Sequence, residues 1–176
     1  MARIPYADTS APELQSFVAE VISQRGSLLH LYQMLAHAPE MASGWLALLT
    51  AVRHHNTLPG ALRELVIVRI AQLNGALYEA DQHMPIALRE GITAAQIAAL
   101  EDWQQSDLFD QRERAVLALT DTMTRSVQVP DELFSTVRRH FPDPQLVELA
   151  ITIGAYNMVS RVIEALAIHG HDHTGN

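Results

Sequence analysis

The segment from Pro59 to Gly91 constrains the fold most, because it carries ionisable side chains inside an otherwise apolar stretch, PGALRELVIVRIAQLNGALYEADQHMPIALREG. Its first part, to about Asn74, is apolar on most of a helical circumference, as is typical of a helix inside a bundle or at a subunit interface. Asn74 and Gly75 then predict a stop or bend before a second helix, which runs from Leu77 to Arg89 and ends at Gly91. We therefore expect two closely connected helices here.

The charged residues of this segment are the candidate site, because buried ionisable groups are costly unless they are paired or used. Glu79 and His83 are four residues apart and share one face of a helix, which suits a carboxylate that orients an imidazole for acid/base chemistry. The same spacing is also typical of an exposed ion pair that only stabilises the helix. Glu64 lies among branched aliphatic residues, where Arg63, Arg69 or another arginine could pair with it. A structural ion pair between helices is the other interpretation of Glu64.

The rest of the chain also predicts helices. No segment alternates apolar and polar residues between hairpin turns, so we expect about eight helices, no sheet and an all-α fold. Capping boxes, which mark helix starts, are predicted at Ser10–Glu13, Thr93–Gln96 and Asp110–Glu113. Asp143 followed by Pro144 predicts the start of a long apolar helix that continues to about Ile168.

An internal duplication is predicted within a single domain that covers residues 1–176. Residues 50–67 can be aligned with residues 135–151 with one gap, and each segment contains a helix end, a proline break and an apolar helix. The repeat units would span about 28–91 and 110–168. The other interpretation is a chance likeness between two amphipathic helix pairs.

Only part of the candidate site has a counterpart in the second half. Glu64 aligns with Glu148, whereas apolar residues stand at the positions that correspond to Glu79 and His83. If the two halves share a fold, the chemistry lies in the first half.

Composition excludes several classes of function. The chain has no cysteine, which rules out disulfides, thiolate metal sites and cysteine-based catalysis. A formal net charge of −8 argues against nucleic acid or an anionic membrane as the main partner. The N-terminus lacks the apolar core of a signal peptide, and no charge-free apolar window long enough to span a membrane is expected. A cytoplasmic location is therefore the expectation.

No metal site and no cofactor are predicted. Glu79 and His83 alone provide too few ligands, and His54 and His55 are interpreted as partners of a helix C-terminus. Histidines in the C-terminal tail could bind a transition metal if the tail is ordered, although a mobile polar tail is the preferred interpretation. These tail histidines are His169, His171 and His173.

The sequence RELVIVRIAQLNGALYEADQHMPIALREGIT resembles the signature region of the carboxymuconolactone decarboxylase and AhpD-like superfamily. The thiol peroxidase branch of that family has a glutamate, a CxxC pair and a histidine. These align here with Glu64, with Ala76 and Glu79, and with His83. The missing cysteines exclude thiol peroxidase chemistry. The arrangement of Tyr78, Glu79 and His83 is similar to the cysteine-free branch, which includes 4-carboxymuconolactone decarboxylase.

The resemblance implies an AhpD-like helical bundle that assembles into trimers or hexamers. It also implies a cofactor-free decarboxylase, a lyase, that acts on a small carboxylated or lactone-type substrate. In this hypothesis His83 moves the proton, Glu79 orients His83, and Glu64 is a second acid/base group or tunes the site. The substrate-binding residues would be Arg63 or Arg69, together with Tyr78. The alternative is a non-catalytic oligomeric module that binds a small ligand.

Overall fold

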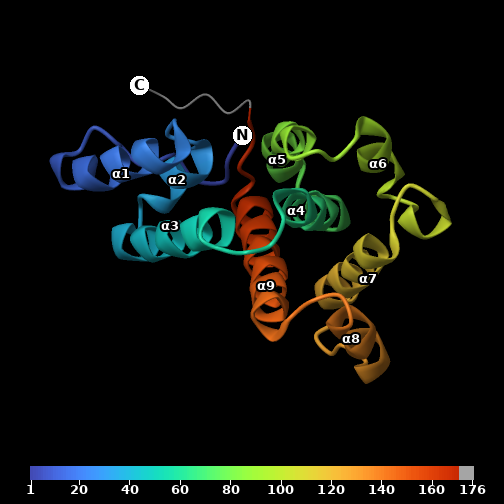
Figure 1. The fold of residues 1–176 in the computed structure, drawn as a ribbon. Helices are drawn as coiled ribbons and strands as arrows, with labels where there is room; N and C mark the ends of the chain where they lie inside the picture. The colour runs from blue at the N-terminus through green and yellow to red at the C-terminus, as the bar shows by residue number, and fades with distance from the viewer. Residues whose placement is uncertain (171–176) are drawn as a thin grey trace. The chain divides into compact units, whose positions relative to one another are not determined.

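A computed structural model of the protein describes residues 1–170, and Figure 1 shows these as a helical chain. Within that range there are α-helices and two short 3-10 helices but no strand, which confirms the predicted all-α class. The helices are η1 (Pro12–Leu14), α1 (Gln15–Arg25), α2 (His30–Leu35), α3 (Pro39–His54), α4 (Gly60–Asn74), α5 (Leu77–Arg89), α6 (Ala94–Ala99), η2 (Trp103–Gln105), α7 (Gln111–Arg125), α8 (Asp131–Arg138) and α9 (Asp143–Leu166).

The chain divides into two compact units. One contains Met1–His55 and the chain from Ile163 onward, and the other contains Asn56–Val162. These boundaries differ from the predicted repeat units, 28–91 and 110–168, so the duplication and the single domain stay predictions. The local pattern of the repeat is present twice, because α3 is followed by a break and α4, and α8 by a break and α9.

The core of the first unit is formed by α1, α2 and α3. Arg25 links these helices, since its Nε donates to Tyr32 Oη at 3.1 Å and its Nη2 donates to Thr50 Oγ1 at 2.9 Å. The buried side chains of this cluster are Leu14, Phe17, Val21, Tyr32, Ala36, Ala42 and Leu46.

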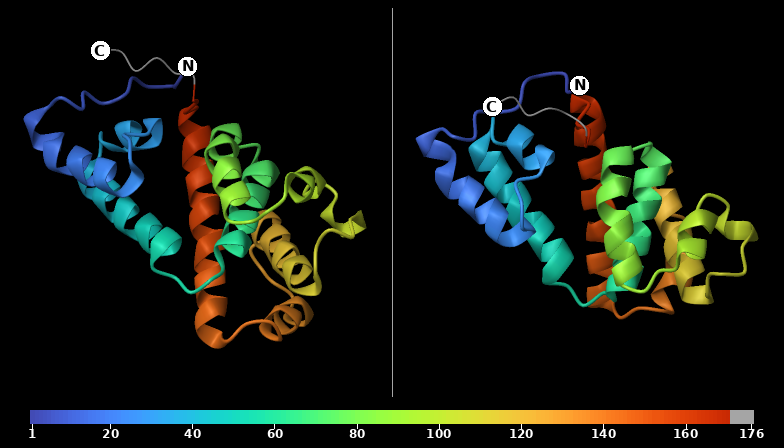
Figure 2. Two further views of the ribbon diagram at one scale, coloured as in Figure 1. Left: turned by 45° about the horizontal axis from the view of Figure 1, so that its top comes forward. Right: turned by 90° about the horizontal axis from the view of Figure 1, so that it is seen from above.

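The second unit is built around α4, which is buried at every position from Glu64 to Ala71. This helix packs against α5 and α7, and Figure 2 shows α4 and α5 side by side in both views. Gly75 ends α4 in the left-handed conformation, with φ of 67°, a region that a residue without a side chain enters at little cost. The prediction of two closely connected, largely buried helices is therefore confirmed.

Two of the predicted capping boxes are present, and one prediction is wrong. Thr93 and Asp110 each accept a hydrogen bond from the backbone N–H three residues on, and the reciprocal side-chain bonds are also made. Ser10 forms no cap, since η1 begins after Ala11 without a side-chain cap, and the Ser10 Oγ donates to Asp8 Oδ1 at 2.6 Å. The side-chain and backbone hydrogen bonds from Ser10 lower the pKa of Asp8.

Helix α9 is apolar but not free of charge, since it contains Glu148, Arg161 and Glu164, so the expectation of no charge-free window that could span a membrane is not contradicted. Its mean hydropathy of 1.4 makes it long and apolar enough to do so by length and composition alone. However, 56% of that window is buried inside the fold, and the core helix of a soluble protein has the same properties. Its buried side chains include Leu149, Ile153 and Tyr156.

Candidate functional site

Glu64 and His83 form a buried pair between α4 and α5. Glu64 Oε2 lies 2.7 Å from His83 Nδ1, and the two residues are 1% and 8% exposed. A carboxylate only accepts hydrogen bonds, so Nδ1 carries the proton that is donated to Glu64. In a neutral imidazole the lone pair then lies on Nε2, which becomes the basic atom of the ring. The pair therefore has the arrangement of a histidine that a carboxylate orients for proton transfer.

The predicted role of Glu79, which is to orient His83, stays a prediction. The i,i+4 spacing places Glu79 and His83 on one face of α5, but the carboxylate that contacts the imidazole at Nδ1 belongs to Glu64. Glu79 is 2% exposed, and its Oε2 lies 2.6 Å from Ser160 Oγ of α9. Glu79 is thus anchored to a different helix from the one that orients the histidine.

Helix α9 also contributes side chains to the site. The Tyr156 ring meets the His83 ring edge-on, with ring centroids 5.1 Å apart, and Ser160 contacts Glu79 one turn further along α9. His83 follows Glu79 in α5, whereas its partner Tyr156 precedes Ser160 in α9, so the two helices run antiparallel at this contact. Figure 2 shows α5 and α9 side by side in both views. Sequence reasoning missed both α9 residues.

Asn157 fixes α9 against its neighbours. Its Nδ2 donates to Thr124 Oγ1 of α7 at 2.9 Å, and its Oδ1 accepts from Asn74 Nδ2 of α4 at 3.2 Å. Arg161 Nη1 donates to the same Oδ1 at 2.7 Å. These bonds hold the register of α9 and so determine which of its side chains face α5. Polar residues inside an apolar helix were the sequence signal for this network.

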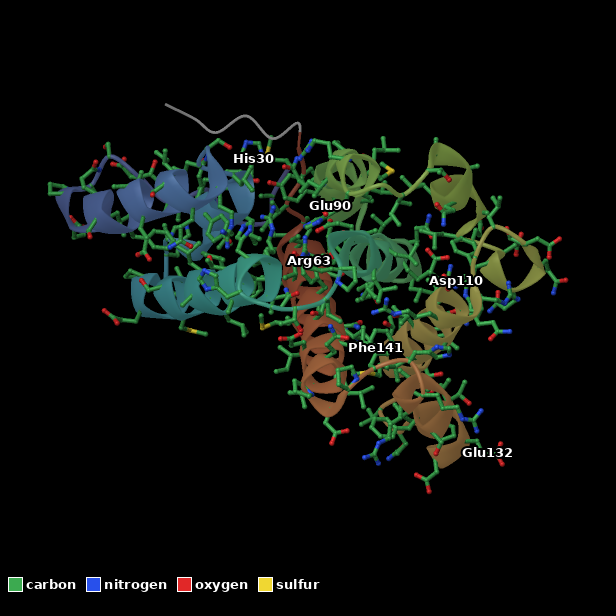
Figure 3. The ribbon with its side chains drawn as sticks, viewed as in Figure 1. His30, Arg63, Glu90, Asp110, Glu132 and Phe141 are labelled. Carbon is green, nitrogen blue, oxygen red and sulfur yellow. The ribbon has the colours of Figure 1, made fainter. Side chains whose placement is uncertain are left out.

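Arg63 is the arginine beside the buried pair. Its Nε lies 3.4 Å from Glu64 Oε1, and its Nη2 lies 3.9 Å from Glu90 Oε1. The side chain of Arg63 is 12% exposed and that of Glu90 is 41% exposed, so Glu90 lies on the solvent side of this pair. Figure 3 labels Arg63 on α4 and Glu90 at the end of α5. Gly60 makes room for Glu90, because a Cβ at that position would overlap the carboxylate.

Arg69, the other predicted substrate-binding arginine, is held in a buried ion pair between helices. Its Nε and Nη2 each donate to a carboxylate oxygen of Asp121 at 2.7 Å, and its Nη1 donates to Leu100 O at 2.7 Å. Trp103 Nε1 also donates to Asp121, at 3.3 Å. Arg69 therefore joins α4 to α7 and the α6–η2 segment. Of the two predicted substrate-binding arginines, Arg63 stays the candidate.

The remaining site predictions are placed as follows. Tyr78 is buried in α5, one residue before Glu79, and its role in substrate binding stays a prediction. No group of three or more His, Cys, Asp or Glu side chains in residues 1–170 is arranged to hold a metal ion. His30 Nδ1 lies 2.8 Å from His169 O, and the tail histidines at 171 and 173 lie outside the described residues.

A concave region lies in the same unit, apart from the buried pair. It is an open cavity of about 640 Å³ between η2, α7 and α8, with a mostly apolar lining. No residue of α4 or α5 lines this cavity, so it is a separate feature from the Glu64–His83 pair. Its lining includes Trp103, Arg114, Ala118, Leu133 and His140.

The all-helical fold and the Glu64–His83 pair define an AhpD-like protein, and known sequences and structures agree with that class. The Carboxymuconolactone decarboxylase family matches residues 39–122, which include both members of the pair. The Bacillus subtilis (strain 168) uncharacterized protein YdfG is 35% identical over 106 residues, or 59% of this chain and 72% of YdfG. The chain belongs to the carboxymuconolactone decarboxylase family.

Solved structures share the fold. A protein of unknown function from Agrobacterium tumefaciens, ATU0492, described as AhpD-type in antioxidant defence, has a TM-score of 0.73 and 26% identity, covering 78% of this chain and 96% of that chain. A variant of the debrominase Bmp8 in complex with 2,3,4-tribromopyrrole has a TM-score of 0.76 and 20% identity, covering 97% of this chain and 91% of that chain. The fold thus occurs in proteins of different description, so function must be argued from the site.

Proposed function

We propose that this protein is a cofactor-free enzyme that transfers a proton at a carbon atom of a small carboxylated or lactone-type substrate. Decarboxylation, a lyase reaction, is the first activity to test. The observation that carries the proposal is the 2.7 Å contact between His83 Nδ1 and Glu64 Oε2 in a nearly closed environment. A carboxylate that fixes the tautomer of an imidazole leaves Nε2 to accept or return a proton.

The proposed reaction requires only acid/base groups and a substrate-binding site from the protein. When a carboxylate leaves as carbon dioxide, the electron pair of the broken C–C bond enters the unsaturation of the substrate. The carbon atom then takes up a proton. In this proposal Nε2 of His83 donates that proton. The guanidinium of Arg63, 12% exposed, supports the binding of a second carboxylate. Thiol peroxidase activity is excluded, because the chain has no cysteine.

The family and the buried pair support enzymatic activity in general, and a substrate screen tests this particular proposal. Lactones and β-keto acids are offered to the purified protein, and carbon dioxide release is measured. His83→Ala should lower turnover by about 10² to 10⁴, the usual contribution of a general acid/base group. His140→Ala is the matched control, because this histidine lines the separate α7–α8 cavity. Equal turnover of His83→Ala and wild type would refute the assignment.

A second candidate function is favoured by the burial of the site. Glu64 and Glu79 are 1% and 2% exposed, which is also expected of groups that only brace helix packing. In that case the protein is a non-catalytic module that binds a small ligand. Two results together would favour this function. The wild-type protein would bind compounds from the screen without converting them, and His83→Ala would lower the stability of the fold.

We also infer that the protein is a cytoplasmic homo-oligomer, a trimer or a hexamer, and that it has no nucleic acid or membrane partner. Support comes from exposed apolar side chains in the second unit, since Leu77, Val147 and Ile151 are 75%, 58% and 46% exposed. Such residues are expected at subunit contacts. Light scattering coupled to size-exclusion chromatography measures the assembly directly, and a monomer at all concentrations would contradict it.

A further inference from the structure

Arg63 and Arg69 lie on the same helix, but their guanidinium groups are hydrogen-bonded to different extents. Arg69 donates from Nε and Nη2 to Asp121 and from Nη1 to Leu100 O, each at 2.7 Å. In the described part of the chain, Arg63 makes one side-chain hydrogen bond, from Nε to Glu64 Oε1 at 3.4 Å. A guanidinium has five N–H donors in a planar fork, so most donors of Arg63 remain for a further acceptor.

The carboxylate of Glu90 is a neighbour of Arg63 that does not use these donors. Its Oε1 lies 3.9 Å from Arg63 Nη2, which is an ion-pair distance but is longer than a hydrogen bond. The Glu90 side chain is 41% exposed, so this ion pair is in contact with solvent. Exposed pairs of this kind contribute little to stability. The contact between Glu90 and Arg63 is therefore easily exchanged for another.

Gly60 provides the space that the Glu90 carboxylate occupies. A Cβ at Gly60 would overlap that carboxylate, and the three atoms nearest to the Cβ all belong to Glu90. Gly60 is also the first residue of α4, which begins without a side-chain cap and has no acidic residue in its first turn. The positive end of the helix dipole therefore adds to the charge of Arg63. We call this carboxylate-sized space, bounded by Gly60 and Arg63, the Gly60–Arg63 site.

We propose that the Gly60–Arg63 site binds a carboxylate of the substrate, and that Glu90 fills the site in the ligand-free protein and is displaced by that carboxylate. Glu90 is then a specificity-determining residue, because an anionic ligand has to replace it. The assignment of the ligand as the substrate rests on the function proposed above. The binding of a carboxylate at this site does not.

The charges around Arg63 favour displacement of Glu90 over addition of a further anion. Arg63 lies between two carboxylates, with Glu64 Oε1 at 3.4 Å and Glu90 Oε1 at 3.9 Å. A third carboxylate beside both would be repelled by like charge. Glu64 is 1% exposed and contacts His83 at 2.7 Å, whereas Glu90 is exposed at the C-terminal end of α5. Glu90 is therefore the carboxylate that a ligand can replace.

Removal of the Glu90 side chain should open the site to a free carboxylate, which can be measured without the substrate. Sodium acetate is the probe, because it matches the end of the removed side chain. We expect acetate to stabilise Glu90→Ala against urea more than it stabilises wild type, with sodium chloride keeping the ionic strength equal. At an acetate concentration ten times the dissociation constant, the unfolding constant of Glu90→Ala should fall by about tenfold. Acetamide, which has a similar shape but no charge, should give no such difference.

Two double variants test whether acetate binds at the proposed position. Gly60→Ala/Glu90→Ala fills the site with a methyl group, and Arg63→Met/Glu90→Ala removes the guanidinium, so both should lose the additional stabilisation by acetate. Glu101→Ala is the matched control for a lost negative charge, because Glu101 is exposed between α6 and η2. It should respond to acetate as wild type does. An equal response of Glu90→Ala and wild type, or of Glu90→Ala and either double variant, overturns the proposal.

These outcomes distinguish the site from the proposed function. With an active protein, Glu90→Ala should lower KM for a carboxylated substrate by about tenfold and leave KM for its methyl ester unchanged, because a nearby like charge is removed. An acetate response of Glu90→Ala in a protein that converts no substrate supports the site and contradicts the enzymatic function. Carbon dioxide release that depends on His83, without an acetate response of Glu90→Ala, supports the enzymatic function and overturns the site.

Discussion

Glu64 and His83 are 19 residues apart in the sequence, yet Glu64 Oε2 lies 2.7 Å from His83 Nδ1. A carboxylate of the neighbouring helix α4 therefore contacts Nδ1 of the imidazole. Gly75 ends α4 shortly before α5 begins. Changes that alter the packing of α4 against α5 should act on the orientation of His83 even where they lie outside the site.

Glu64 and His83 should act as one catalytic unit. Glu64→Gln removes the charge that orients the ring, and we expect kcat/KM to fall toward the value of His83→Ala. The double variant should be no slower than His83→Ala alone, because residues that act as a unit are not additive. The measurement is kcat/KM with a substrate from the carbon dioxide screen, and Glu132→Gln on the surface of α8 is the control. Losses that multiply in the double variant would show independent roles.

Replacing Arg69 should lower the free energy of unfolding. Arg69→Met leaves Asp121, 6% exposed, without its bidentate partner, and we expect a loss of about 3–5 kcal/mol in the free energy of unfolding. Arg125 is the control, because its Nη1 lies 3.6 Å from the same carboxylate while its side chain is 62% exposed. Arg125→Met should cost less than about 1 kcal/mol. Urea unfolding measures both, and equal losses would contradict a structural role for Arg69.

Gly60 should be coupled to Glu90. An alanine at position 60 displaces the Glu90 carboxylate, which also lies near Arg63. At Gly154, in α9, an added Cβ meets nothing within 4 Å, so Gly154→Ala should stabilise the protein by about 0.5–1 kcal/mol. Gly60→Ala should stabilise the protein less than Gly154→Ala does. This difference in stability should disappear in a Glu90→Ala background. Thermal unfolding of Gly60→Ala, Gly154→Ala, Glu90→Ala and the Gly60→Ala/Glu90→Ala double variant measures this, and an equal gain at both glycines would disprove the coupling.

Arg63 should affect substrate binding more than turnover. Loss of a hydrogen-bonded charge is worth about 1.5–3 kcal/mol, so Arg63→Met should raise KM for a carboxylated substrate by about tenfold to a hundredfold. The methyl ester of the same substrate provides the control, because it lacks the charge that the guanidinium would bind. An equal rise in KM for acid and ester would point to a change in packing.

Local features of the fold could be predicted from the sequence. The capping boxes at Thr93 and Asp110 and the glycine that ends α4 depend on a few adjacent residues, and the structure contains them. The burial of α4 follows from its apolar circumference. Ser10 shows the limit of such signals, because the capping-box pattern is present there but the helix begins one residue later, after Ala11, without a side-chain cap.

The partners within the site could not be predicted in the same way. Helical spacing indicates that Glu79 and His83 share a face, but it does not indicate which neighbouring helix is closer to each side chain. That depends on the packing of α4 and α9 against α5, which brings Glu64 to His83 and Ser160 to Glu79. Polar residues such as Ser160 within the apolar sequence of α9 were the available signal.

The two contacts between α5 and α9 lie one helical turn apart on each helix, His83 with Tyr156 and Glu79 with Ser160. A single inserted residue in α9 before Tyr156 would rotate both partners by about 100° about the helix axis. Both contacts would then be lost together. An insertion in the break between α8 and α9 would leave this alignment intact. Tolerance to insertions along residues 139–160 should therefore change abruptly where α9 begins.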